Sequence, residues 1–262
     1  MWMRQFKLKR KLMAEGRTDL SAWHEARPPF LEAEASSRYI YFAEVTGCPL
    51  LIVHISAKEV IPILAQAKAK GLKVYGETCP QYLTLTKDGP YGVLGKVNPP
   101  LRTPEDNEAL WEAVRLGLIE HIGSDHAACA TKHKRELWEA IVGFAGVETM
   151  LPVMISEGVN KGRIGLEKLT EIMSYNNAKL FGLLPRKGII SVGADADIVI
   201  LNLKKILKIR ADKLHHISDF TPFEGMEVKG WPEKVFVKGQ LLSENGELVG
   251  KPIGTYIKCG SP

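Results

Sequence analysis

The sequence predicts an α/β fold in which parallel strands alternate with helices, followed by a β-rich segment. An uninterrupted aliphatic and β-branched run at residues 49–56 is typical of a strand covered on both faces, and similar runs recur at 73–79 and 118–125. Helical segments with short links separate these runs, which requires parallel pairing and right-handed crossovers. Beyond Pro185 the pattern shifts to alternation, which indicates short strands joined by turns.

The first helices are marked by apolar spacing and by their ends. Residues 4–16 and 28–47 carry apolar side chains near helical spacing, and each segment closes on a glycine. Ser56 with Glu59 three residues later predicts a capping box. The helix that follows this box is expected to end at Gly71.

The next helices follow the same logic. Thr103 with Pro104 at the first helical position predicts a helix start, and Gly117 is expected to close that helix. Residues 134–144 and 166–183 are also expected to be helical, since glycines or asparagines stand near their ends.

The chain is expected to divide near residue 186. Strands are predicted within 188–203, 234–242 and 247–257, where Gly, Asp and Asn mark the turns. The division predicts two parts, 1–186 with the parallel strands and 187–262 with the short ones.

Composition places the chain among ordinary globular proteins and narrows its partners. It has 262 residues, 45% of them hydrophobic and 25% charged, with a formal net charge of +5. The basic residues are dispersed, and the cluster at 4–12 reads as a solvated helix face, so neither nucleic acid nor membrane is an expected partner. No run approaches the ~20 apolar residues of a spanning helix. The widely spaced cysteines indicate no zinc knuckle or disulfide framework and favour a reducing cytoplasm: Cys48, Cys79, Cys129 and Cys259.

Polar side chains follow the three predicted parallel strands. His54 ends the first, Glu77 ends the second and Asp125 ends the third. Functional groups of such folds gather at the carboxyl ends of strands. An imidazole and a carboxylate suit zinc or a similar cation, and the carboxylate can also accept a proton from water. On the residues alone, a histidine at such a position is more often a hydrogen-bonded structural residue than a ligand, and Asp125 could equally cap the next segment.

Several short motifs occur in order along the chain: "HEARPPFLEAEA", "LLIVHIS", "YGETCPQYL", "KVNPPLR", "IGSDHA", "GVETMLP" and "KGIISVGADADIVI". Together they resemble successive motifs of the dihydropyrimidinase and hydantoinase family, the cyclic-amide branch of the amidohydrolase superfamily. The resemblance runs from about residue 10 to near the C-terminus.

The resemblance implies a fold and an activity. It implies a partial TIM (β/α) barrel that covers the last three strands, followed by a small β-sandwich-type segment. The implied reaction is metal-dependent hydrolysis of the C–N bond of a hydantoin, dihydropyrimidine or allantoin-like ring at a centre of two divalent metals, expected to be zinc. His54 and Asp125 match metal ligands of the family. Asp125 also matches the catalytic proton carrier, and Asn98, which precedes "PPLR", matches a residue that contacts substrate through its backbone.

The chain departs from the family pattern in its ligand set. The family's H-x-H pair, carboxylated lysine and first histidine ligand have no counterpart, so the chain is expected to begin after the fifth strand and to hold an incomplete site. His24 is interpreted as structural. Cys129 replaces a histidine typical of dihydroorotases, which argues against dihydroorotate, and Val142 replaces an asparagine. A homo-oligomer or a companion N-terminal segment is the expected partner, and a non-catalytic dihydropyrimidinase-related assembly or binding protein is the alternative function.

Other polar residues are given structural roles. His126 is interpreted as a neighbour that supports Asp125, because adjacent residues at a strand end point in different directions. Glu77 and Cys79 are expected to shape the loop after the second strand. The remaining histidines are interpreted as surface or packing residues: His121, His133, His215 and His216.

Overall fold

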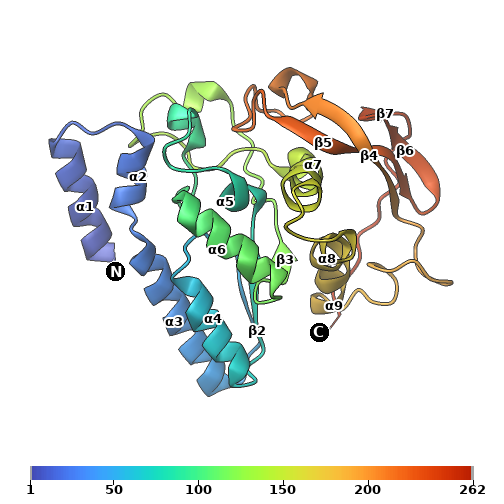
Figure 1. Ribbon diagram of the computed structural model, residues 1–262, viewed down its shortest axis with the longest axis horizontal. Coiled ribbons are helices and arrows are strands. Elements are labelled where there is room, and N and C mark those ends of the chain that lie inside the picture. The colour runs from blue at the N-terminus through green and yellow to red at the C-terminus, as the bar shows by residue number, and fades with distance from the viewer. Residues whose placement is uncertain (1, 261–262) are drawn as a thin grey trace. The chain divides into compact units, whose positions relative to one another are not determined.

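The computed structural model describes residues 2–260, with side chains from residue 4 onward. The chain forms two compact units. The first comprises Met1–Met150 and Arg210–Glu224, and the second comprises Leu151–Ile209 and Gly225–Pro262 (Figure 1). The predicted boundary near residue 186 lies within the second unit, and the division of the complete protein into domains there remains a prediction.

The first unit is built on a three-stranded parallel sheet. Its strands are β1 (Leu50–Ile52), β2 (Val74–Thr78) and β3 (His121–Ile122), in the order β1-β2-β3. The prediction of parallel strands separated by helices is confirmed. Each strand is shorter than the run that predicts it: β1 and β3 end before His54 and Asp125, whereas β2 includes Glu77.

Helices flank this sheet and supply most of the apolar core. In α4 the buried residues Val60, Leu64 and Ala67 recur at helical spacing, and in α6 Leu110 and Val114 do the same. The helices of this part are α1 (Trp2–Ala14), α2 (Leu20–Ala26), α3 (Pro29–Thr46), α4 (Val60–Ala69), α5 (Pro80–Thr84) and α6 (Pro104–Arg115).

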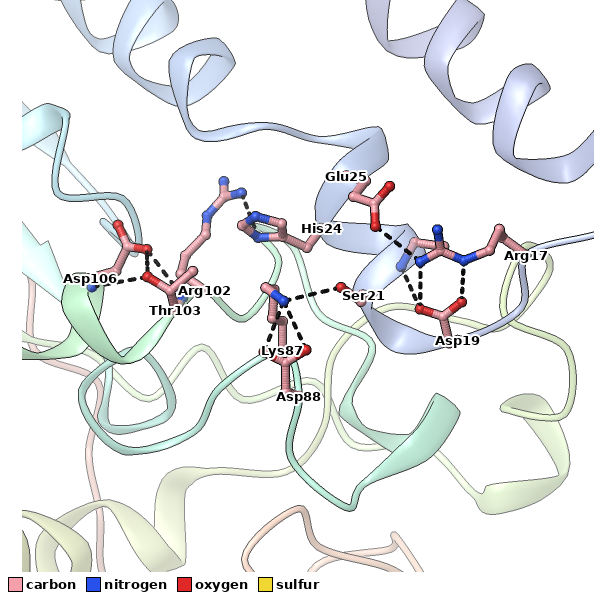
Figure 2. A network of polar contacts seen from close by, with 11 residues as sticks. Arg17, Asp19, Ser21, His24, Glu25, Lys87, Asp88, Arg102, Thr103 and Asp106 are labelled. Carbon is pink, nitrogen blue, oxygen red and sulfur yellow. Dashed lines mark hydrogen bonds and ion pairs between the residues drawn. The ribbon is translucent and has the colours of Figure 1, made fainter. Parts of the chain in front are cut away.

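The two predicted helix starts have different outcomes. The start at Thr103 is confirmed: α6 begins at Pro104, and Thr103 also forms a capping box with Asp106, whose carboxylate accepts from the Thr103 backbone at 3.1 Å (Figure 2). The box at Ser56 is wrong. The Ser56 hydroxyl is bound to the Glu32 carboxylate at 2.5 Å, and α4 starts only at Val60 without a side-chain cap.

The prediction of a helix over 134–144 is also wrong. A short 3-10 turn, η2 (Thr131–His133), precedes an irregular segment that is held by distant partners. The buried Lys134 ammonium donates to the carbonyls of Leu94 and Lys96, and the Trp138 indole donates to the Arg17 carbonyl. These long-range bonds outweigh local helix propensity.

The second unit joins short helices to an antiparallel sheet. The predicted helical stretch at 166–183 is confirmed as α8 (Leu166–Thr170), the π-helical η4 (Glu171–Tyr175) and α9 (Asn176–Leu180). They follow α7 (Val147–Val153) and the π-helical η3 (Met154–Asn160). The sheet order is β4-β5-β6-β7, with bounds Ile198–Lys208, Glu227–Val237, Gln240–Glu244 and Glu247–Leu248.

The structure of residues 187–262 differs from the predicted β-rich segment in two places. Residues 188–197 and 249–257, which are all described, contain no strand. Residues 210–224 belong to the first unit, where the Ser218 hydroxyl accepts from the Cys129 backbone and the Asp219 carboxylate accepts from Thr131. Within the described chain, no helix has the length and apolarity needed to cross a membrane, and all four cysteines are free.

Candidate active site

Three titratable side chains meet at the carboxyl edge of the parallel sheet. His54 lies two residues beyond β1, and Asp125 lies three residues beyond β3. Glu77 is the residue before the last in β2. The strands run in the same direction, so their carboxyl ends share one edge. The structure thus brings His54 and Asp125 together as the sequence predicts, while their roles in metal binding and proton transfer remain predictions.

Backbone hydrogen bonds continue the sheet past its last paired residues. The Ile55 amide donates to the Glu77 carbonyl at 2.8 Å, and the Thr78 hydroxyl donates back to the Ile55 carbonyl at 2.6 Å. The Gly123 amide donates to the Thr78 carbonyl at 2.9 Å. These bonds fix the chain on either side of each candidate residue.

The pKa values of both carboxyl groups are raised, and burial is the main cause in each case. Burial raises the pKa of Asp125, and the charge of His54 opposes that rise. Burial also raises the pKa of Glu77; a backbone hydrogen bond from His54 and the His54 charge oppose this, while the Asp125 charge adds to it. His54, Glu77 and Asp125 therefore lie close enough to interact electrostatically, and Glu77 belongs to the site more directly than the sequence indicates.

His54 and Asp125 adopt an uncommon backbone conformation. Their φ angles are 45° and 49°, in the left-handed region that non-glycine residues rarely occupy. Such a conformation costs on the order of 1–3 kcal/mol and persists where surrounding contacts impose it, often at functional sites. The geometry therefore supports a functional assignment for both residues independently of their chemistry.

Gly123 leaves room for the Glu77 carboxylate. A Cβ atom at Gly123 would lie 2.6 Å from the Glu77 carboxyl carbon, well inside van der Waals contact. The acid thus packs directly against the backbone of the neighbouring strand end. The sequence signal for this close approach was the glycine between β3 and Asp125.

The loop that carries His54 is held by carboxylates from other elements. Glu32 of α3 accepts from the Ser56 amide at 2.7 Å and from the Ala57 amide at 3.2 Å. Asp106 of α6 accepts from the Lys58 amide at 2.9 Å. These contacts replace the missing helix cap and fix the chain just beyond His54.

Arg102 completes this anchor from the buried interior. Its guanidinium donates to the Glu32 carboxylate and the Ser56 hydroxyl, each at 3.0 Å, and to the Arg27 carbonyl at 2.6 Å. The residue is only 2% exposed. Its Nη1 also lies 3.4 Å from Nδ1 of His24, which supports the structural interpretation of that histidine (Figure 2).

A cavity of about 520 Å³ borders the site within the first unit, and both His54 and Asn98 line it. The loop around Asn98 is fixed on both sides. The Trp23 indole donates to the Val97 carbonyl at 2.9 Å, and the Tyr82 hydroxyl donates to the Pro99 carbonyl at 2.9 Å. Asn98 itself is exposed to the cavity.

The other histidines have structural contacts. Nδ1 of His126 accepts from the backbone amides of Gly146 and Val147, both at 3.3 Å, which ties the loop after β3 to the start of α7. His121 is buried and packs edge-on against Tyr75, and His133 is exposed. His215 binds the Glu148 carboxylate at 2.8 Å, and His216 contacts the Ser218 carbonyl.

The donor set fits a metal ion only in part. Among residues 4–260, no three His, Cys, Asp or Glu side chains are arranged to hold a metal. His54 and Asp125 have the right chemistry for a divalent cation, but two protein donors are too few for tight binding.

Residues 36–242 match the amidohydrolase family, which is most of the chain. The chain therefore belongs to the amidohydrolase family.

Within this family, the similar proteins include hydantoinases and allantoinases. The chain is 39% identical over 260 residues to the L-hydantoinase of Paenarthrobacter aurescens, covering 95% of this chain and 56% of that protein. It is 39% identical to the D-hydantoinase of Geobacillus stearothermophilus, covering 96% and 56%, and 32% identical to an allantoinase of Rubrobacter xylanophilus, also covering 96% and 56%. The resemblance to hydantoinases and dihydropyrimidinases is thus confirmed.

Solved structures agree with this grouping. A crystal structure of a D-hydantoinase superposes with a TM-score of 0.93 at 37% identity, covering 98% of this chain and 58% of that one. The L-hydantoinase (dihydropyrimidinase) of Arthrobacter aurescens gives a TM-score of 0.90 at 38% identity, covering 95% and 56%. The chain thus has a mixed α/β fold like that of hydantoinases, and it spans a little over half the length of the relatives it matches.

Proposed function

We propose that this chain carries part of the active site of a metal-dependent hydrolase that opens a cyclic amide at its C–N bond. The substrate would be a hydantoin, a dihydropyrimidine or an allantoin-like ring. The observation that carries the proposal is the meeting of His54 and Asp125 in left-handed conformations at one sheet edge. The names of the relatives, hydantoinase and allantoinase, point to the same ring chemistry.

The proposed architecture follows from the sheet. We propose that β1, β2 and β3 correspond to the last three strands of a (β/α) barrel and that the antiparallel sheet of the second unit corresponds to a β-sandwich-type segment. Parallel order with intervening helices supports the first assignment, and the strand order β4-β5-β6-β7 supports the second.

In the proposed mechanism, Asp125 moves the proton. The carboxylate takes a proton from the attacking water and returns it to the departing ring nitrogen. The His54 imidazole would hold the metal ion, and Asn98 orients the ring through its backbone. Family members generally use divalent metals; such an ion, proposed to be zinc, would supply Lewis-acid activation of the ring carbonyl and of water.

We propose that a companion N-terminal segment supplies the remaining ligands, and that the partner of the chain is either this segment or further copies of the chain in a homo-oligomer. The alternative is a non-catalytic assembly or binding protein related to dihydropyrimidinases, which the partial donor set of the described residues favours. The proposed setting is the cytoplasm, in keeping with the free cysteines.

The test is to measure the size, zinc content and hydrolytic activity of the purified chain. Hydantoin, dihydrouracil and allantoin serve as substrates, with and without a polypeptide equivalent to the remaining part of a hydantoinase. Activity is expected only with the added polypeptide, and Asp125→Asn should abolish it. Tight stoichiometric zinc with turnover by the chain alone would refute the incomplete-site proposal. Absence of turnover in every combination would leave the non-catalytic alternative.

A further inference from the structure

The cavity beside His54 has an excess of positive charge. Among the described residues that line it, Lys9, Arg27 and Arg102 are cationic and Glu32 is the only acid. Glu32 is already engaged, since its carboxylate binds Arg102 and Ser56. The charges of Lys9 and Arg27 are therefore not neutralised by the cavity wall.

Arg27 is the clearest of these unneutralised groups. Its guanidinium stacks on Trp23, with the central carbon 3.5 Å from the ring centroid. When the Gln5 amide is oriented with its oxygen towards Arg27, Nε and Nη2 donate to that oxygen at 3.0 and 2.9 Å, while the buried Nη1 has no hydrogen-bond partner among the described residues. The Arg27 guanidinium thus has a neutral acceptor where a carboxylate is the natural partner of such a cation.

Neighbouring groups reinforce this imbalance. Burial and the Arg102 charge lower the pKa of Arg27 to about 10. Burial lowers the pKa of Lys96 to about 8, with the charges of Arg27 and Lys9 adding to that effect. No acid appears among these influences, so the cations of this region repel one another and would be stabilised by an added anion.

The shape of the cavity relates this charge to the proposed reaction. The cavity has His54 and Asn98 on its wall as well as Arg27 and Lys9. Its volume of about 520 Å³ lies within the range of small-molecule sites, about 300–1,000 Å³. A ligand placed there can present an amide ring to His54 and Asn98 and an acidic substituent to Arg27.

We propose that Arg27, assisted by Lys9, forms a carboxylate subsite that selects cyclic amides bearing an acidic side chain. The inference rests on the proposed function, because it assumes that the ring binds beside His54. Arg27 is held in place by Trp23 and Gln5, so its positive charge is fixed at the cavity wall, where it attracts an acidic group. Lys9, whose ammonium lies 5.9 Å from the Trp138 ring centroid, contributes a second charge.

The experiment compares an acid with its neutral isostere on the full chain. Hydantoin-5-acetic acid and hydantoin-5-acetamide have the same ring and nearly the same shape, so their difference isolates the charge. Calorimetric titration at low salt is expected to show at least a five-fold preference for the acid, which decreases as salt is added. Arg27→Gln should remove the preference and Lys9→Gln should reduce it.

Matched variants separate a subsite from a folding effect. Arg10→Gln removes an exposed cation from the same helix as Lys9, outside the cavity lining, and should leave the preference unchanged. Arg27→Lys keeps the charge and should retain part of the preference, even if Arg27→Gln lowers the unfolding midpoint. A preference that survives Arg27→Gln, or one lost equally in Arg10→Gln, would overturn the assignment.

The two ligands also distinguish this inference from the proposed function. Equal binding of acid and amide would overturn the carboxylate subsite while supporting recognition of the ring. Binding of the acid alone, with its Arg27 dependence, would support the subsite. Failure of both ligands to bind would overturn the subsite, whereas the proposed function would still be decided by the activity measured with the added polypeptide.

Discussion

Left-handed residues occur in both units, and their settings differ. In the second unit, Lys238 and Asn245 have φ angles of 50° and 55° and lie in the turns between β5 and β6 and between β6 and β7. Tight hairpin turns require such angles, so the local chain accounts for them. In the first unit, His54 and Asp125 follow parallel strands, where no hairpin imposes the conformation. The comparison teaches that a positive φ indicates function only where the local turn does not explain it.

The contacts that hold the left-handed residues in place also differ between the two units. A hairpin residue is fixed by the strands on either side of it. His54 is fixed by side chains that are distant in sequence, since Glu32 and Arg102 bind the loop at Ser56. The comparison therefore predicts that remote substitutions disturb the His54 loop, whereas the hairpins depend on their own sequence.

The largest expected effect follows removal of Arg102. Arg102→Ala leaves the Glu32 carboxylate without its buried cation and should lower the free energy of unfolding by about 3–5 kcal/mol. Urea unfolding followed by fluorescence measures this change. Arg115→Ala is the matched control, because its pair with Glu112 is exposed and its loss should leave the midpoint nearly unchanged. If both variants lost a similar free energy of unfolding, the buried contacts of Arg102 would contribute no more to stability than an exposed ion pair.

A smaller effect is expected at Gly123. Gly123→Ala places a methyl group 2.6 Å from the Glu77 carboxyl carbon, so the acid must move and unfolding should become easier by about 1–3 kcal/mol. Gly254→Ala is the control, because open space surrounds that position and its φ is ordinary. Thermal melts of both variants provide the measurement. An unchanged Gly123→Ala protein would mean that Glu77 does not depend on this approach.

Glycine substitutions test the left-handed comparison directly. His54→Gly and Lys238→Gly should each relieve strain and stabilise the fold by about 1 kcal/mol, because glycine tolerates positive φ. Only His54→Gly should also abolish the hydrolytic activity that is expected in the presence of the added hydantoinase polypeptide. Loss of that activity in Lys238→Gly, or full activity in His54→Gly, would contradict the functional assignment of His54.

The smallest expected effect is on the pH dependence of stability, and it compares Lys96, whose pKa is lowered, with Lys187, whose pKa is raised. Burial lowers the pKa of Lys96 to about 8, and the charges of Arg27 and Lys9 add to that effect. Between pH 8 and the ordinary lysine value of 10.5, the unfolded chain then binds more protons than the folded chain, so this lysine makes stability rise with pH. In the second unit, burial opposes a rise in the pKa of Lys187, but hydrogen bonds to Asp197 and Asp195 raise it.

Two variants measure this contrast by urea midpoints from pH 7 to well above 10.5, because the stability that Lys187 contributes is lost only beyond the ordinary lysine value. Lys96→Met should remove the part of the wild-type stability that grows above pH 8. Lys187→Met should act in the opposite sense, because a raised folded pKa gives stability that is lost as pH passes through that value. Parallel curves for the two variants and the wild type would contradict both assignments.

Much of the fold could be predicted from local signals. Apolar runs gave the three parallel strands, and Thr103 with Pro104 gave the start of α6. The errors arose where partners distant in sequence intervene. Ser56 looked like a cap, but Glu32, 24 residues away, takes its hydroxyl. The segment at 134–144 looked helical, but bonds from Lys134 and Trp138 to remote carbonyls hold it open.

The site could be predicted in position more than in detail. Strand ends indicated His54 and Asp125, because parallel strands present their carboxyl ends together. The involvement of Glu77 was underestimated, since its closeness to both residues depends on Gly123 and on the exact register of β2 and β3. The unneutralised charge of Arg27 had no sequence signal, because it depends on which acids are already engaged elsewhere.

The return of residues 210–224 to the first unit affects how the chain folds. The polypeptide leaves this unit after Met150 and comes back sixty residues later, where Ser218 and Asp219 secure residues 129–131. The ribosome must therefore synthesise residues 151–209, most of the second unit, before the first unit can fold completely. A protease cut within 151–209 would leave the fragments noncovalently associated, and an expression clone that stops near residue 186 would give a first unit lacking one of its own parts.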